Sequence, residues 1–251
     1  MKTRHSRGDP AILAEIKQII GERPTYGYRR VTAIMRAKRK ELGQKMINHK
    51  RVYRLMKVNN LLLARYAPRP ERVHEGQVMT KKSNSRWCSD AFYITCDNGE
   101  RVQVAFSLDT CDREAISYVS TNGGINGAMI CDLMAETMIK RFKGADQVPH
   151  KIQWLSDNGP CYVARETVKY GRSIGLEICR TRPYSPESNG MAEAFVKTIK
   201  RDYVSLGDLS SAKNVMKQLP CWFEDYNEKA PHKSLNMMSP REYIRNSRCA
   251  A

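Results

Sequence analysis

The sequence predicts an α/β protein in which a mixed five-stranded sheet with flanking helices follows a small helical domain. Two observations support this prediction. Residues 1–65 show helical periodicity, whereas the chain from residue 87 begins with short alternating segments and continues with alternating helices and strands. Charge divides the chain at a similar place, because residues 1–82 hold 21 Lys and Arg against six Asp and Glu, +15 of the total +17. Two parts with different roles are therefore expected.

The first 65 residues are expected to form a small bundle of three helices. Apolar residues recur every three or four positions, and Pro24-Thr25-Tyr26-Gly27 is a turn signal between the first two helices. The expected helices span residues 10–20, 28–39 and 48 to about 61. We interpret residues 1–65 as a helix-turn-helix-like DNA-binding domain, because a strongly basic segment favours a polyanionic partner.

Basic residues gather on the second and third of these helices. Six of them are candidates for contact with DNA: Arg29, Arg30, Lys50, Arg51, Arg54 and Lys57. The alternative is an ordinary solvated face, which is common on surface helices. Further Lys and Arg residues in the second helix favour DNA binding over that alternative.

Residues 66–86 lack periodicity, contain two prolines and many charges, and are expected to be a linker. We expect residues 87–210 to form the core and residues 211–251 to form its C-terminal helical extension. Asp97-Asn98-Gly99 is a hairpin turn signal between the first two strands. The strands are expected at residues 90–96, 101–108, 115–120, 152–156 and 176–179. Core helices are expected at residues 126–142, 161–171 and 188 to about 206.

The residue pattern excludes several classes of protein. The longest apolar runs are far below the roughly 18 residues needed to cross a bilayer, so no membrane association is expected. Eight cysteines without a C-x-x-C pair indicate reduced thiols rather than a zinc ribbon or a redox motif. A disulfide framework is the weaker alternative for a long chain without a secretory signal. A cytoplasmic protein is therefore expected.

Three acidic residues occupy informative places in the expected core. Asp90 opens the first strand, Asp157 directly follows the fourth, and Glu193 lies in the last helix. Carboxylates from separate elements can converge on hard cations, and two Mg²⁺ ions about 4 Å apart can support phosphoryl transfer. The alternatives are structural. Asp157-Asn158-Gly159-Pro160 is also a good turn sequence, and Glu193 with Lys197 can be an ordinary i, i+4 surface pair.

These acids resemble the D, D(35)E signature of retroviral-integrase-like transposases, because 35 residues separate Asp157 from Glu193. Over roughly Pro24 to Ile244 the chain is similar to the OrfB proteins of bacterial insertion sequences that have two overlapping reading frames. The blocks that carry the resemblance are Trp87-Cys88-Ser89-Asp90, Ser156-Asp157-Asn158-Gly159, Ser185-Pro186-Glu187-Ser188-Asn189-Gly190-Met191-Ala192-Glu193, and Tyr226-Asn227 followed by Pro231-His232 and Ser239-Pro240-Arg241-Glu242.

The resemblance implies an RNase H-like fold for the core, with the three acids as catalytic and metal-binding residues at one edge of the sheet. It also implies Mg²⁺, or Mn²⁺ in its place, as two ions. Lys200 is assigned to contact with the terminal DNA, and helical spacing places Lys197 on the same face. Asn158 and Asn189 are expected to shape the site by hydrogen bonds. Glu187 is a rival third acid, but it precedes the helix beside a proline.

The implied function is that of a DDE transposase catalytic subunit, which cleaves and joins DNA strands at insertion-sequence ends by hydrolysis and transesterification. The expected partners are double-stranded DNA of the element ends and the target, an upstream-frame partner or fusion, and further copies of the chain in an active homo-oligomer. The expected location is the bacterial cytoplasm, in association with the nucleoid. Two alternatives stay open: a structure-specific nuclease on the same fold, and a non-catalytic DNA-binding remnant or regulator of an insertion element.

Overall fold

The computed structural model describes residues 9–64, 80–144, 147–181 and 190–249. The chain divides into two compact units, Met1–Arg72 with Lys229–Ser239, and Val73–Glu228 with Pro240–Ala251. Most of the expected linker, the start of the last expected core helix, Glu187 and Asn189 lie outside the described residues. Within the described ranges, none of the helices combines the length and the apolar character that crossing a bilayer requires.

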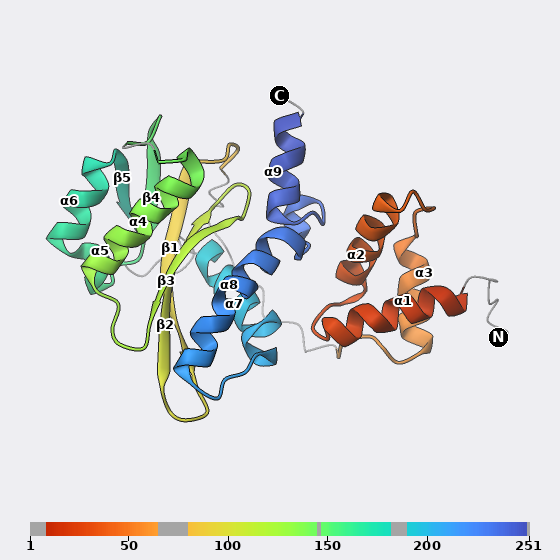
Figure 1. The fold of residues 1–251 in the computed structure, drawn as a ribbon. Coiled ribbons are helices and arrows are strands. Elements are labelled where there is room, and N and C mark those ends of the chain that lie inside the picture. Colours follow the sequence, from red (N-terminus) through yellow and green to blue (C-terminus); the bar gives the residue numbers. More distant parts are fainter. Residues whose placement is uncertain (1–8, 65–79, 145–146, 182–189, 250–251) are drawn as a thin grey trace. The chain divides into compact units, whose positions relative to one another are not determined.

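The first unit contains the three predicted helices, α1 (Asp9–Glu22), α2 (Tyr28–Glu41) and α3 (His49–Val58) (Figure 1). Their shared core includes the fully buried side chains of Ile16, Val31, Met35, Val52 and Met56. The Asn48 side chain caps α3 by accepting a hydrogen bond from the Lys50 N–H at 2.9 Å. The helix ends at Val58, earlier than predicted, because Asn60 adopts a left-handed conformation with a φ of 55°.

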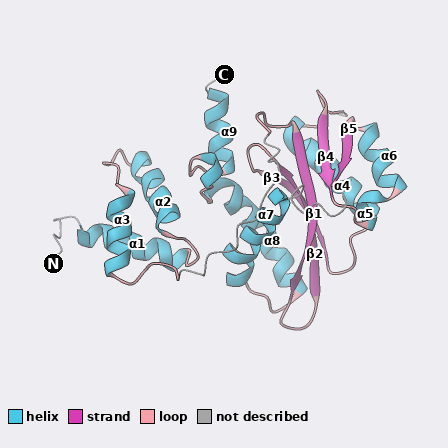
Figure 2. Cartoon of the chain, turned by 180° about the vertical axis from the view of Figure 1, so that it is seen from behind, coloured by secondary structure: helices cyan, strands magenta, loops and turns pink. Residues whose placement is uncertain are grey.

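The second unit is built on a mixed five-stranded sheet with the order β3-β2-β1-β4-β5 (Figure 2). Its strands are β1 (Arg86–Thr95), β2 (Arg101–Asp109), β3 (Ala115–Thr121), β4 (Ile152–Ser156) and β5 (Leu176–Arg180). Strands β1, β2 and β3 pair antiparallel, whereas β4 is parallel to β1 and β5 is parallel to β4. The predicted mixed sheet is confirmed.

Strand β1 begins at Arg86, so Asp90 lies in the middle of the strand, and the prediction that it opens the strand is wrong. Residues 86–88 pair with β2 or β4, and Trp87, Cys88 and Ser89 are all buried. A strand that is covered on both faces loses the alternation of polar and apolar residues by which strands are recognised. That loss hides the true start of β1 in the sequence.

One face of the sheet is covered by α4 (Gly127–Phe142), α5 (Pro160–Val163) and α6 (Arg165–Ser173) (Figure 1). Sequence periodicity predicts a single helix over residues 161–171, but the structure has two. Ala164 separates them with an extended ψ of 134°. The Thr167 hydroxyl stabilises the break by donating a hydrogen bond of 2.8 Å to the Cys161 carbonyl.

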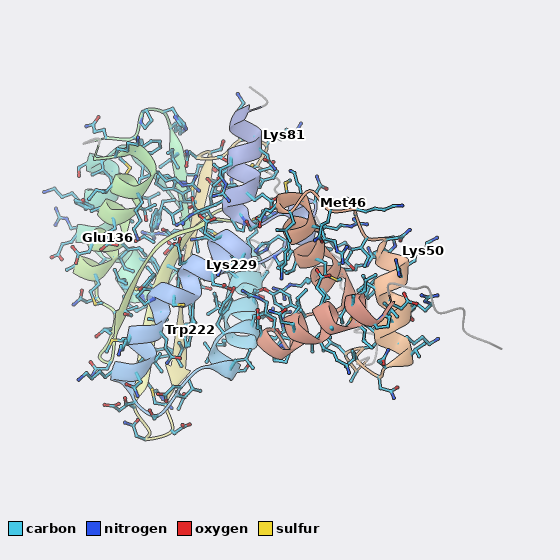
Figure 3. The ribbon with its side chains drawn as sticks, turned by 45° about the vertical axis from the view of Figure 1, so that its right-hand side comes forward. Met46, Lys50, Lys81, Glu136, Trp222 and Lys229 are labelled. Carbon is cyan, nitrogen blue, oxygen red and sulfur yellow. The ribbon has the colours of Figure 1, made fainter. Side chains whose placement is uncertain are left out.

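The opposite face is covered by α7 (Gly190–Asp202) and α8 (Ala212–Lys229). Ring contacts fasten both helices to the sheet, with centroids 4.4 Å apart for Phe106 and Phe195 and 4.2 Å apart for Tyr118 and Phe223. Helix α7 ends at Asp202, earlier than predicted, and the chain tightens into a 3-10 turn at Val204–Leu206. Gly207 follows this turn and lies against the ring of Trp222 from α8, which Figure 3 labels. A Cβ atom added to Gly207 would come within 2.4 Å of that ring.

The C-terminal part of the second unit is held by two polar side chains. The Asn227 amide donates to the Ala115 carbonyl and accepts from the Ala115 N–H, each at 2.9 Å, and so pairs with the start of β3 as a neighbouring strand would. From α9 (Pro240–Cys249), Arg241 forms ion pairs with Glu114 at 2.8 Å and with Glu224 at 2.7 Å. The last of the sequence blocks that carry the family resemblance, which contains both Asn227 and Arg241, therefore has a structural role.

Candidate active site

Asp90 projects toward the α7 side of the sheet. Its neighbour Ser89 points the other way, because the Ser89 hydroxyl is hydrogen bonded to the Tyr162 hydroxyl of α5 at 2.9 Å. Asp90 is paired with Phe106 on β2, and the Phe106 ring packs on Phe195 of α7. Because paired residues share one face of a sheet, the Asp90 side chain lies on the face that α7 covers.

Asp157 lies beside Asp90 at the end of β4. The parallel pairing of β1 with β4 sets Cys88 opposite Leu155, so continuing that register by two residues brings Asp157 level with Asp90. Asp157 Oδ1 accepts a hydrogen bond from the Gly159 N–H at 3.0 Å. The turn that was the structural alternative for this segment is therefore present, and it also fixes the direction of the Asp157 carboxylate.

Asn158 ties this turn to the neighbouring strand. Its side-chain amide donates to the Thr181 carbonyl at 3.2 Å, just beyond the end of β5. The Thr181 N–H in turn donates to the Ser156 carbonyl at 3.0 Å. Asn158 thus has the geometry of a residue that shapes the loop carrying Asp157, whereas Asn189 lies outside the described residues.

Glu193 lies in the first turn of α7, two residues before the ring of Phe195. Its Oε2 accepts a hydrogen bond from Lys197 Nζ at 3.0 Å, so the i, i+4 pair that the spacing allowed is formed. Lys200 lies farther along the same helix, with its ammonium 5.9 Å from the centre of the Phe92 ring. Phe92 is two residues after Asp90 on β1, and Lys200 therefore lies close to the strand that carries this acid.

The three acids influence one another electrostatically. Burial raises the pKa of Asp90 to about 6, the Ala91 N–H opposes this rise, and the charges of Asp157 and Glu193 add to it. In the described ranges no further hydrogen bond reaches Asp90 Oδ2, Asp157 Oδ2 or Glu193 Oε1. These are hard oxygen atoms of the type that Mg²⁺ and Mn²⁺ bind.

The carboxylates are within electrostatic reach of one another but are not drawn together as metal ligands. Among the described residues, no three His, Cys, Asp or Glu side chains form a group that could hold a metal ion as it stands. Like-charge repulsion and the Glu193–Lys197 pair both favour this open arrangement. The donor set fits a divalent cation in its chemistry and in its free oxygen atoms.

The six basic residues proposed for DNA contact occupy different environments in the first unit. Arg51 and Arg54 both form ion pairs with Asp9, at 2.9 Å and 3.0 Å, and Asp9 is only 3% exposed. Lys50 and Lys57 are exposed on α3, where Figure 3 marks Lys50. Sequence reasoning missed the role of Asp9, which lies 42 and 45 residues from its two partners.

The two arginines at the start of α2 stack on tyrosines. The guanidinium of Arg30 lies 3.4 Å from the centre of the Tyr26 ring, and that of Arg29 lies 5.5 Å from the centre of the Tyr28 ring. Arg29 also donates a hydrogen bond to the Tyr28 hydroxyl at 3.0 Å. Arg29 is exposed, whereas Arg30 is partly covered.

Family models match most of the chain. An HTH-like domain model matches residues 8–70, and two integrase core domain models match residues 80–186 and 174–240. By structure, the chain is similar to a chain of the simian T-cell lymphotropic virus intasome in complex with PP2A regulatory subunit B56 gamma. That similarity has a TM-score of 0.54 at 16% identity and covers 75% of this chain and 66% of that chain. It supports the predicted RNase H-like integrase fold.

Two relatives from Escherichia coli align with almost the whole chain. Transposase InsD for insertion element IS2A/D/F/H/I/K is 48% identical over 250 residues, which are 99% of this chain and 82% of the relative. The insertion element IS2A uncharacterized 48.2 kDa protein is also 48% identical, and the chain covers 58% of its length. The chain therefore belongs to the insertion-element transposase family that includes InsD of IS2, with an integrase core domain preceded by an HTH-like domain.

Proposed function

We propose that this transposase chain cleaves and joins DNA strands at the ends of an insertion element, by phosphodiester hydrolysis followed by transesterification. One observation carries the proposal. Asp90, Asp157 and Glu193 come from β1, the end of β4 and α7, yet the pKa of Asp90 responds to both other charges. A cluster of partly exposed carboxylates is suited to divalent metal ions and a phosphate substrate.

In this proposal Asp90, Asp157 and Glu193 hold the metal ions, which we expect to be two Mg²⁺ or Mn²⁺. When bound, such ions lower the pKa of a water or hydroxyl nucleophile and stabilise charge on the leaving oxygen. The turn at Gly159 and the hydrogen bond from Asn158 keep the Asp157 carboxylate in one direction. The Phe106–Phe195 contact holds the helix that bears Glu193 against β1.

Lys197 and Lys200 are proposed to bind phosphates of the terminal DNA. Both are exposed cations on α7, four and seven residues after Glu193, and hence on the helix face that Glu193 occupies. Lys197 pairs with Glu193 in the absence of metal, so metal binding at Glu193 leaves its ammonium free for a phosphate. Lys200 has no carboxylate within 4.0 Å among the described residues.

The HTH-like domain is proposed to bind double-stranded DNA through the exposed members of its basic set. Lys50 and Lys57 of α3 and Arg29 of α2 are the strongest candidates, since they are exposed and form no ion pair with the described residues. Arg30 rests on Tyr26 at the edge of this set. Arg51 and Arg54 act first as structural partners of Asp9 and can offer DNA only their remaining donors.

Assembly is also part of the proposal. We expect the working complex to contain several copies of the chain and a segment encoded by the upstream reading frame, either fused or as a separate partner. The longer IS2A relative, of which this chain covers 58%, is consistent with a fusion of that kind. Association with the bacterial nucleoid follows from binding to the element ends and to target DNA.

The test compares Asp157→Asn with the matched control Asp132→Asn, which removes one exposed carboxylate from α4 on the other face of the sheet. With Mn²⁺ and supercoiled plasmid, the wild type and Asp132→Asn are expected to nick and join strands, and Asp157→Asn is expected to do neither. Circular dichroism checks that both variants stay folded. Strand cutting by the wild type in EDTA would contradict the proposal.

The products distinguish this function from its alternatives. A duplex oligonucleotide with a free 3′ hydroxyl should become covalently joined to the plasmid, which gel electrophoresis detects as a larger labelled product. Cut but never joined strands would indicate a structure-specific nuclease instead. DNA binding that survives alanine at all three acids, without any product from the wild type, would indicate a non-catalytic DNA-binding regulator.

A further inference from the structure

Arg113 lies in the turn between β2 and β3 in an unusual environment. Its backbone adopts a left-handed conformation with a φ of 63°, which is uncommon for a residue with a long side chain. Its N–H donates to the Asp109 carbonyl at 3.0 Å, which holds the turn. Residues held in such uncommon backbone conformations cluster at active sites and ligand-binding sites.

The guanidinium of Arg113 has no anionic partner within the described residues. Its Nη1 contacts the sulfur of Met191, and its Nε is buried without a hydrogen-bond acceptor. No carboxylate of the described residues lies within 4.0 Å of it. A partly buried charge that meets only a thioether is unfavourable for folding, because the thioether is a weak acceptor and does not replace the lost hydration.

The acidic residues of the same turn are already bound to other arginines. Asp112 and Glu114 lie 3.0 Å and 3.2 Å from the Arg141 guanidinium, and Glu114 also pairs with Arg241 at 2.8 Å. Asp109 faces Arg141 as well, at 3.7 Å. Thus the turn contains enough carboxylates to neutralise Arg113, yet they are directed elsewhere.

Arg113 lies near two segments, α7 and β1, each of which carries one of the candidate catalytic acids. Met191, which it contacts, precedes Glu193 by two residues in α7. Burial raises the pKa of Cys88 to about 12, and the nearby charge of Arg113 opposes that rise. Cys88 precedes Asp90 by two residues on the same face of β1. The guanidinium therefore lies near the first turn of α7, which carries Glu193, and near the part of β1 that precedes Asp90.

Lys200 marks the other side of the carboxylate cluster. It lies seven residues after Glu193, about 10 Å along the helix at 1.5 Å per residue. Arg113, in contrast, contacts the first turn of the same helix. Positive charge thus flanks the three carboxylates at both ends of α7, an arrangement that suits a chain of phosphates passing over a metal site.

We propose that Arg113 binds a backbone phosphate of the DNA strand at the candidate active site, on the opposite side of the carboxylates from Lys200. The inference rests on the proposed function, since it takes DNA as the substrate. A guanidinium can bind two phosphate oxygens at once, which supplies the hydrogen bonds and the negative charge that Arg113 lacks. The contact with Met191 holds the side chain in place before DNA arrives.

The experiment measures the affinity of the full chain for a 20-base-pair duplex by fluorescence anisotropy, in EDTA and at several salt concentrations. Arg113→Gln is expected to bind about tenfold more weakly, the order of one charged hydrogen-bonded contact. The slope of log affinity against log salt should fall by about one. Arg113→Lys keeps the charge and should retain the wild-type slope.

Arg172→Gln is the matched control. Arg172 is an exposed arginine of α6, on the sheet face opposite α7, without an ion pair among the described residues (Figure 1). It should bind DNA with the wild-type affinity and slope. The melting temperature of Arg113→Gln should equal or exceed that of the wild type, because the substitution removes no ion pair. A lower melting temperature with an unchanged salt slope would mean that Arg113 is structural, and the proposal would be wrong.

The two proposals fail in different ways. If the wild type cuts no DNA with Mn²⁺, the proposed catalytic function fails, whereas the binding comparison in EDTA still decides whether Arg113 contacts phosphate. If the wild type cuts DNA and Arg113→Gln has unchanged affinity and unchanged KM, only the role of Arg113 is overturned. The expected kinetic result is a raised KM for DNA, with cutting restored at saturating DNA.

Discussion

Two clusters of acidic side chains in the second unit differ in how their negative charge is balanced. In the turn after β2, Asp109 and Asp112 are fully buried around Arg141, which is itself only 6% exposed. At the candidate active site, Asp90, Asp157 and Glu193 influence one another electrostatically, and no arginine among the described residues forms an ion pair with them. Burial raises the pKa of Asp109 and the charge of Asp112 adds to the rise, whereas the charge of Arg141 opposes it. Burial raises the pKa of Asp90 to about 6.

The difference lies in where the compensating cation comes from. Arg141 donates hydrogen bonds to both oxygens of Asp112, at 3.0 Å and 3.1 Å, so the first cluster is neutralised by the chain itself. At the second cluster, the ion pair that the described residues form is that of the exposed Lys197 with Glu193. This difference is consistent with the proposal that the second cluster binds an external cation.

The largest expected effect is the loss of stability when Arg141 is removed from its cluster of carboxylates. Arg141→Met leaves Asp109 and Asp112 buried without their counterion and should lower the free energy of unfolding by about 3–5 kcal/mol, the typical result of removing one partner of a buried pair. Urea denaturation followed by circular dichroism measures the change. Arg172→Met serves as an exposed control and should change the free energy of unfolding by less than about 0.5 kcal/mol. A comparable loss in both variants would show that Arg141 has no special structural role.

Removing the charge of Asp90 should change the free energy of unfolding in the opposite direction, because it should stabilise the fold. Because the folded-state pKa of Asp90, about 6, lies above its ordinary value of 3.8, its protonated form stabilises the fold below about pH 4, and that contribution is lost as the pH rises through 6. At pH 7 in EDTA, Asp90→Asn should therefore raise the free energy of unfolding by about 1–2 kcal/mol, after allowance for partial exposure. The same variant should abolish strand cutting.

The pH profile checks this assignment. The difference in stability between the wild type and Asp90→Asn should grow from pH 4 to pH 7 and then level off, as followed by thermal unfolding in metal-free buffer. A pH-independent difference, or a less stable variant at pH 7, would mean that the Asp90 carboxylate is not held under repulsion by its neighbours.

The two clusters also differ in how far the sequence reveals them. Asp157 is found readily, because a short apolar strand and a turn signal bracket it, and Glu193 follows at a diagnostic spacing. Arg141 carries no such local signal. Its partner Asp112 lies 29 residues earlier and meets it only when α4 packs on the sheet. Ion pairs between distant segments, such as Arg51 with Asp9, depend on tertiary packing and escape periodicity arguments for the same reason.

The helices and strands can likewise be predicted from the sequence only in part. The five strands and the amphipathic helices are visible as periodic patterns, but their ends depend on single residues, such as the left-handed Asn60 after α3 and the extended Ala164 between α5 and α6. The sequence pattern does not predict the middle position of Asp90 in β1, because both faces of the strand are buried there. Burial from two sides is a property of the packed sheet and leaves no alternation in the sequence.

The smallest effect should come from Lys197, which forms an ion pair with Glu193 at the candidate active site. Lys197 and Glu193 are 61% and 39% exposed, so their pair should contribute little to stability, and Lys197→Met should lower the free energy of unfolding by less than about 0.5 kcal/mol. Mn²⁺ binding, measured by calorimetry, should be at least as tight in Lys197→Met, because Glu193 Oε2 loses its competing partner. Lys213→Met, an exposed control on α8, should leave Mn²⁺ binding unchanged. If Lys197→Met instead destabilised the chain as Arg141→Met does, the active-site acids would be neutralised internally after all, and the contrast between the two clusters would disappear.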